Sequence, residues 1–124
     1  MAFENPVSTF PGLEAAADLS THQFKFVKVT ANRRVNITGA GEQAIGVLQD
    51  DPDAAGKSAA VWGPGSTSKV VAGAAVTAGD KVMSDATGRA ITATSTNFIN
   101  GVAIEAAAGA GAVITVLLVP GGKL

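Results

Sequence analysis

Cysteine is absent from this chain of 124 residues, and histidine and tryptophan each occur once. The absence of cysteine excludes disulfides, zinc–thiolate sites and thiol catalysis, so the fold must be stabilised by packing. No run of residues approaches the ~20 apolar positions that span a bilayer. The first residues also lack the basic and apolar regions of a signal peptide. We therefore expect a soluble protein that no signal peptide exports.

The chain also lacks a large excess of either charge. Nine basic and ten acidic residues give a net charge of −1, which is too small for the positive field that attracts phosphate backbones. Lys25, Lys28, Arg33 and Arg34 lie close together in the sequence, but they alternate with apolar residues on an expected strand. This pattern is typical of a solvated face. We expect neither nucleic acid nor a membrane as a partner.

Residues that could carry catalytic chemistry are few and scattered. His22 stands alone, and the spacing of Asp50, Asp51 and Asp53 favours a solvated acidic loop over a calcium loop. No Gly-x-Ser-x-Gly nucleophile motif occurs. The glycines within residues 39–41 are followed by an expected strand, whereas a dinucleotide site needs a long helix there. The sequence thus predicts a protein that is not an enzyme and has neither a cofactor nor a metal site.

What the chain does contain is an internal repeat. When the sequence is laid over itself so that Val27 falls on Val82, eight positions match in one register. Both copies have the pattern of a strand, a polar turn, a second strand, a short third strand that begins at a Gly-Val pair, a loop of small residues and a closing strand. The sequence therefore predicts an all-β fold, a small barrel in which residues 27–61 and 82–116 form two copies of one unit. The matching residues are Val27, Ala31, Arg34, Gly46, Val47, Ala55, Gly56 and Val61 in the first copy, and Val82, Ala86, Arg89, Gly101, Val102, Ala110, Gly111 and Val116 in the second.

The apolar residues suggest more burial than one chain provides. Much of the hydrophobic 47% is alanine, and a core of small residues gains less from burial than one of Leu and Phe. Residues 113–119 are apolar on both faces, as expected for a strand that is covered on both sides. Burial between subunits would add to this core, so we expect a homo-oligomer.

The N-terminal segment, residues 1–21, differs from the rest of the chain. It is punctuated by proline and glycine, and its large apolar residues follow neither a strand nor a helix period. We interpret residues 1–21 as an N-terminal arm and residues 22–124 as a single β-barrel domain. Phe3, Phe10 and Leu13 in the arm are candidate partner-binding residues, because a segment that buries little alone docks through such side chains. Trp62, at a strand end, is the fourth candidate.

Several segments resemble a known family. Residues 73–90, 99–107 and 116–118 resemble the small capsid cement or decoration proteins of tailed bacteriophages, and residues 26–29 and 44–48 look like that family's opening hairpin and restart strand. The resemblance implies a β-barrel or β-tulip domain that trimerises and bridges major capsid protein subunits on the outside of the phage head, which it stabilises. It also implies a non-enzymatic virion protein that is made in the host cytoplasm.

One alternative comes from another functional class. Residues 78–82 also resemble turns in small β-barrel modules that bind a ligand or carry a cofactor. A carrier would display a modifiable lysine at the tip of a hairpin. Lys81 instead follows directly from a turn into an expected strand, which favours the structural interpretation.

Overall fold

The strands follow the predicted alternation of apolar and polar residues. The computed structural model describes residues 9–124, and this part of the chain contains twelve strands and no helix. The all-β prediction is therefore confirmed. The strands are β1 (Glu14–Ala15), β2 (Phe26–Ala31), β3 (Arg34–Ile37), β4 (Gly46–Leu48), β5 (Val61–Trp62), β6 (Thr67–Val71), β7 (Lys81–Ser84), β8 (Ala90–Thr92), β9 (Phe98–Ile99), β10 (Gly101–Ala103), β11 (Val113–Leu117) and β12 (Gly122–Lys123).

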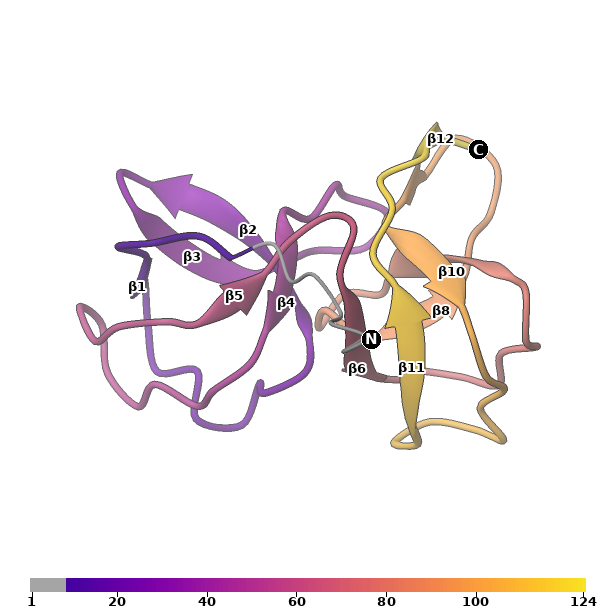
Figure 1. The fold of residues 1–124 in the computed structure, drawn as a ribbon, viewed down its shortest axis with the longest axis horizontal. Helices are drawn as coiled ribbons and strands as arrows, with labels where there is room; N and C mark the ends of the chain where they lie inside the picture. Colours follow the sequence, from indigo (N-terminus) through magenta and orange to yellow (C-terminus); the bar gives the residue numbers. More distant parts are fainter. Residues whose placement is uncertain (1–8) are drawn as a thin grey trace, which may run out of the picture.

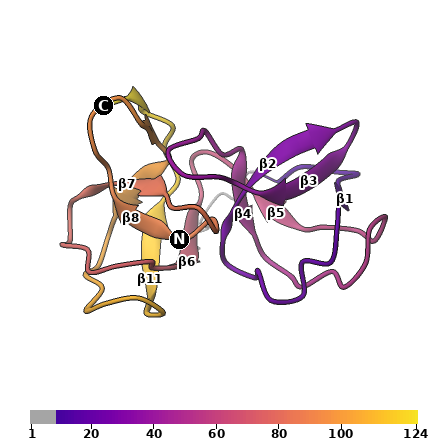
Figure 2. The ribbon, with the colours of Figure 1, turned by 180° about the vertical axis from the view of Figure 1, so that it is seen from behind.

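The strands form two five-stranded sheets that lie side by side. The first sheet has the order β1-β3-β2-β4-β5 and the second the order β6-β11-β10-β7-β8, while β12 and β9 form a separate pair. Figure 1 shows the first sheet in indigo to magenta beside the second sheet, whose strands run to yellow. The same two lobes are visible from behind in Figure 2.

The internal repeat is confirmed by the strand register. Val27 pairs with Ile37 in the first copy, and the equivalent residue Val82 pairs with Thr92 in the second. The same correspondence holds at β4, whose pairings recur at β10. Because register fixes which side chains share a face, the two copies place equivalent residues on equivalent faces. The recurring pairs are Val27–Gly46 with Val82–Gly101, Val47–Trp62 with Val102–Leu117, and Leu48–Val61 with Ala103–Val116.

The repeat also includes a segment ahead of the two predicted copies. The amide of Ala15 donates to the Lys57 carbonyl, and that of Ala72 donates to the Ala112 carbonyl. Likewise, the bridge between Glu14 and Ser58 in the first copy is equivalent to the pair Val71–Val113 in the second. Residues 9–15 therefore lie beside the first copy in the same way that residues 67–72 lie beside the second. We call residues 9–62 the first unit and residues 67–117 the second unit. The division into an arm (1–21) and a domain (22–124) remains a prediction, and the described part of that arm lies along the first unit.

Two clusters of buried side chains form the core. The first core lies within the first unit, and the second core lies mainly within the second unit. Neighbouring residues of a strand point to opposite faces, so Val27 and Leu48 enter the first core while Phe26 and Val47 enter the second. The first sheet is therefore covered on both faces. The first core consists of Ala15, Leu19, Val27, Val35, Leu48, Ala59 and Val61; the second consists of Phe26, Val47, Val70, Ala72, Val76, Val82, Ala90, Ala103, Ala107, Ile114, Val116 and Leu118.

The turn between β7 and β8 is organised by one carboxylate. Asp85 Oδ1 accepts hydrogen bonds from the amides of Thr87 (2.9 Å) and Arg89 (2.8 Å), and Oδ2 accepts one from Arg89 Nε at 2.9 Å. Burial alone would raise the pKa of Asp85, but the hydrogen bonds from Arg89 and Thr87 outweigh it and lower the pKa below its usual value. The ionised carboxylate therefore stabilises this turn.

Replacing Asp85 with asparagine is expected to lower the free energy of unfolding at pH 7 by about 1 kcal/mol. Because the folded pKa is depressed, the wild-type advantage is present above the unfolded pKa of about 4 and is lost as the pH falls through the folded pKa. Urea denaturation at a series of pH values measures this. Asp51→Asn, at an exposed position, is the control and should leave stability unchanged. A constant difference between Asp85→Asn and wild type from neutral to acid pH would contradict the prediction.

Candidate functional site

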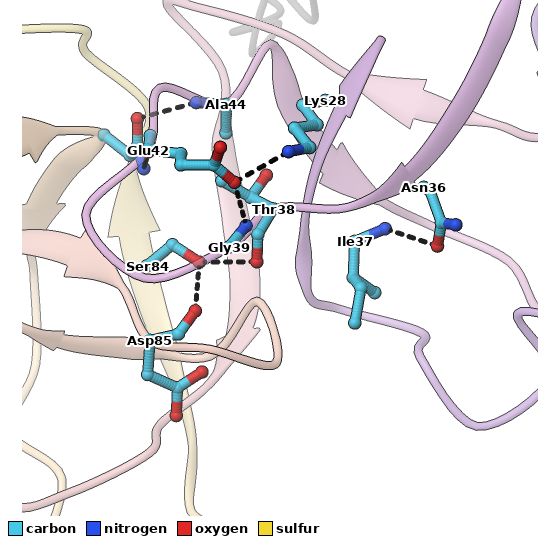
Figure 3. A network of polar contacts seen from close by, with 10 residues as sticks. Lys28, Asn36, Ile37, Thr38, Gly39, Glu42, Ala44, Ser84 and Asp85 are labelled. Atoms are coloured by element: carbon cyan, nitrogen blue, oxygen red, sulfur yellow. Dashed lines mark hydrogen bonds and ion pairs between the residues drawn. The ribbon is translucent and has the colours of Figure 1, made fainter. Parts of the chain in front are cut away.

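The two units are joined by hydrogen bonds that cross from one sheet to the other. The loop after β3 provides several of them, and Figure 3 shows two, at Thr38 and Ala44. Ser84 Oγ donates to the Thr38 carbonyl at 3.1 Å, and the amide of Ala44 donates to Asn100 Oδ1 at 3.0 Å. The Phe26 amide also donates to the Gly88 carbonyl at 2.7 Å. With Phe26 inserted in the second core, these bonds make the two units one packed body.

An ion pair fixes the same loop on the first unit. Lys28 Nζ lies 2.7 Å from Glu42 Oε1, which also accepts a hydrogen bond from the Gly39 amide at 2.7 Å (Figure 3). The hydrogen bonds from Lys28 and from Gly39 hold the pKa of Glu42 below its usual value. The carboxylate thus remains ionised and holds the loop against β2.

A groove of about 390 Å³ lies beside β6 at the junction of the two units. Trp62 is half-buried there and also packs against the second core. Gln49 Nε2 donates to Ser68 Oγ at 2.8 Å and to the Val47 carbonyl at 3.1 Å, so this amide links the units across the groove. The groove therefore combines one indole with amide, hydroxyl and ammonium groups. Its lining residues are Phe24, Gln49, Trp62, Thr67, Ser68, Lys69 and Thr115.

One face of the second sheet carries exposed apolar side chains. Along β11, Ile114 and Val116 are buried, whereas Val113 is 50% exposed. Ile104, directly after β10, is 54% exposed. We call this surface the outer face; it consists of Val71, Val102, Ile104, Val113 and Leu117, and it meets the groove at the paired residues Lys69 and Thr115. Within the described residues, the outer side of β11 is thus only partly covered, since Val113 is exposed and Leu117 is half-buried. The Glu105 carboxylate accepts hydrogen bonds from Thr115 on that side, so the expectation of a strand covered on both sides is met only in part by this chain alone.

The four predicted partner-binding residues lie on the first unit or outside the described part of the chain. Phe3 lies outside the described residues. Phe10 and Leu13 are half-buried and pack against the first core. Thr9 forms an antiparallel bridge with Trp62, which brings the Phe10 segment beside the Trp62 strand end. Their role as partner contacts remains a prediction. The outer face was not among the predicted sites, although the apolar pattern of residues 113–119 was the signal for it.

The scattered ionisable residues have structural partners. His22 Nδ1 lies 3.1 Å from Lys25 Nζ, and burial together with Lys25 lowers the pKa of His22. Asp50 Oδ1 accepts a hydrogen bond from the Ala60 amide at 3.1 Å, and Asp53 forms an ion pair with Lys57 at 2.6 Å. Residues 9–124 contain no group of three or more acidic or histidine side chains arranged to hold a metal ion. The same residues form no helix long and apolar enough to cross a membrane.

Comparisons with known proteins give a family and a fold. The model of the phage cement protein family matches residues 14–118, which span both units. Among solved structures, the N base of head fiber gp8.5 from bacteriophage phi29 superposes with a TM-score of 0.74, covers 96% of this chain and 98% of that chain, and is 16% identical in sequence. At this identity the likeness shows a shared fold alone. No curated protein sequence matches the chain.

Proposed function

This chain belongs to the phage cement protein family, and we propose that it binds the outer surface of a phage head as an oligomer and stabilises the shell. The observation that carries the proposal is the match of the phage cement protein family to residues 14–118, which span both units; exposed Ile104 and Val113 on the outer face add a surface suited to burial against protein. The family is structural, which favours a role without catalysis.

The proposed mechanism is the addition of contacts between capsid subunits. Each bound copy would bridge neighbouring major capsid protein subunits, and many copies together would oppose the internal pressure of the packaged genome. A rigid adaptor suits this task, since its two units share a core and cross-unit hydrogen bonds. We propose a trimer as the bound form, made in the host cytoplasm and located on the exterior of the virion.

Phage heads that lack this protein are expected to release their DNA at a lower temperature than heads that carry it. The measurement compares heads from a deletion phage before and after addition of the purified protein, with DNA release followed by dye fluorescence during heating. Addition should restore the wild-type release temperature, because binding to the intact shell stabilises it by mass action.

A heat-denatured preparation of the same protein serves as the control and should restore nothing. The proposal would be wrong if the folded protein did not bind the deletion heads. It would also be wrong if it bound them without any change in the release temperature.

A further inference from the structure

The two units of one chain already show how one unit packs on another. The face of the first sheet that carries Phe26, Val47 and Trp62 lies on the second core. Phe26 and Val47 are fully buried in this contact, and Trp62 is half-buried. The contact is heterologous, because the sheet face of one unit meets the core side of the other.

The repeat defines the equivalent face on the second unit. In the register that matches Val27 with Val82, the positions of Phe26, Val47 and Trp62 correspond to Lys81, Val102 and Leu117. Val102 and Leu117 are half-buried members of the outer face, on which Ile104 and Val113 are 54% and 50% exposed. Phe26 and Val47 are thus fully buried at the first unit, whereas their counterparts at the second unit are less covered: Lys81 is exposed and Val102 is half-buried.

The core side of each unit, on which a sheet face can pack, differs in the complementary way; we call this surface of the first unit the receiving side. Val70 in the second core is fully buried, and its counterpart in the first unit is Leu13, which is half-buried. Asn100, whose side chain the first unit covers by hydrogen bonds at Ala44 and Glu42, corresponds to the half-buried Ile45. The first unit therefore presents apolar side chains where the second unit is covered by its neighbour. Phe10 and Ile37 extend this apolar set around the first core.

We propose that the outer face of the second unit packs on the first unit of a second copy of this chain, against Phe10, Leu13, Ile37 and Ile45. The contact continues, head to tail, the one that joins the two units within a chain. This inference rests on the proposed oligomeric function and specifies which surfaces join the copies. It also accounts for the apolarity of residues 113–119 on both faces, since the second copy covers the face that one chain leaves open.

The intermolecular contact differs from the intramolecular one at the position of Phe26, which is fully buried in the second core. The second unit has Lys81 there, exposed at the start of β7, so the contact between copies does not extend over this position and the ammonium stays in water. A head-to-tail contact closes into a ring when the rotation between copies allows it and otherwise grows into a filament. A trimeric ring is the closed form that agrees with the proposed function.

Two complementary variants test this contact. The first carries Ile104→Asp and Val113→Asp on the outer face; the second carries Phe10→Ser and Leu13→Ser on the receiving side. Sedimentation velocity at concentrations up to about 100 µM measures self-association, and circular dichroism verifies that each variant is folded. Leu124→Asp, which changes a similarly exposed apolar residue near the separate β12–β9 pair, is the matched control.

We expect the wild type and Leu124→Asp to form the same oligomer. Each double variant should weaken self-association by about a hundredfold or more, because charged or polar groups replace buried apolar contacts. A mixture of the two variants should form a heterodimer, since each retains the surface that the other has lost. A monomeric wild type, an unchanged oligomer of the outer-face variant, or no heterodimer from two folded variants would overturn the proposal.

Binding to deletion heads separates this inference from the proposed function. If the outer-face variant remains an oligomer and still stabilises heads, the surface assignment is wrong and the head-binding function stands. If the wild type assembles as described but does not bind heads, the function is wrong and the self-contact stands.

Discussion

Replacement of Gly46 with alanine will lower the free energy of unfolding by about 3 kcal/mol or more. A Cβ atom at this position would lie well inside contact distance of the Trp62 carbonyl oxygen on the adjacent strand β5. Backbone cannot move aside as a flexible side chain can, so β4 and β5 would have to separate and expose the edge of both cores. A loss of this size is a large share of the stability of a small domain. Thermal and urea unfolding followed by circular dichroism measure it.

Gly109→Ala is the matched control, because a Cβ atom there meets nothing within 4 Å. It should change stability by less than about 1 kcal/mol. The repeat supplies a second test at Gly101, where a Cβ atom would lie 2.6 Å from the Leu117 carbonyl oxygen. Gly101→Ala should therefore destabilise the protein in the same way. If Gly46→Ala proved as stable as Gly109→Ala, the close approach of β4 and β5 would be incorrect.

Replacement of Phe26 with alanine will cost about 3–5 kcal/mol, the range for a large buried side chain that leaves a cavity. Phe26 is the largest fully buried side chain that the first unit contributes to the second core. The loss should fall mainly on the second unit, since the first core does not include Phe26. Hydrogen exchange should accordingly rise more in β7, β10 and β11 than in β3.

Val29→Ala, on the same strand at a position that is 50% exposed, controls for truncation of an apolar side chain on β2. We expect it to change stability by no more than about 0.5 kcal/mol. Equal increases in exchange in both units after Phe26→Ala would show that Phe26 does not act chiefly at the junction.

The repeat could be predicted from the sequence only where the offset, the number of residues between equivalent positions of the two copies, is constant. From Phe24 onward the backbone contacts recur at the offset that separates Val27 from Val82. The earlier segments correspond at a slightly larger offset, because there Ala15 matches Ala72. The connection from Ala72 to Val82 is shorter than the one from Ala15 to Val27, and a fixed offset therefore misses the match. Residues 9–15 consequently resembled an arm in the sequence, although they pair along the first unit.

The candidate surfaces illustrate the same limit. Phe10 and Leu13 were candidates because they are large apolar residues in a segment without a strand or helix period, and Trp62 because it is an indole at a strand end. The structure places Phe10 and Leu13 against the first core, with the Phe10 segment beside Trp62. The outer face did not stand out, because its residues alternate with core residues of the same type along β11. Sequence pattern shows that Val113 and Ile114 are both apolar, but only the sheet shows which of them a single chain buries.

The asymmetry between the two cores bears on the order in which the chain becomes structured during synthesis. The first core draws its buried residues from positions 15–61 alone, whereas the second requires Phe26 and Val47 from the earlier half. N-terminal segments leave the ribosome first, so the leading half can complete its interior before the trailing half has been translated. The trailing half then folds against the completed first unit, and a nascent chain arrested once Trp62 has emerged from the ribosome should already protect β2 and β4 from proteases.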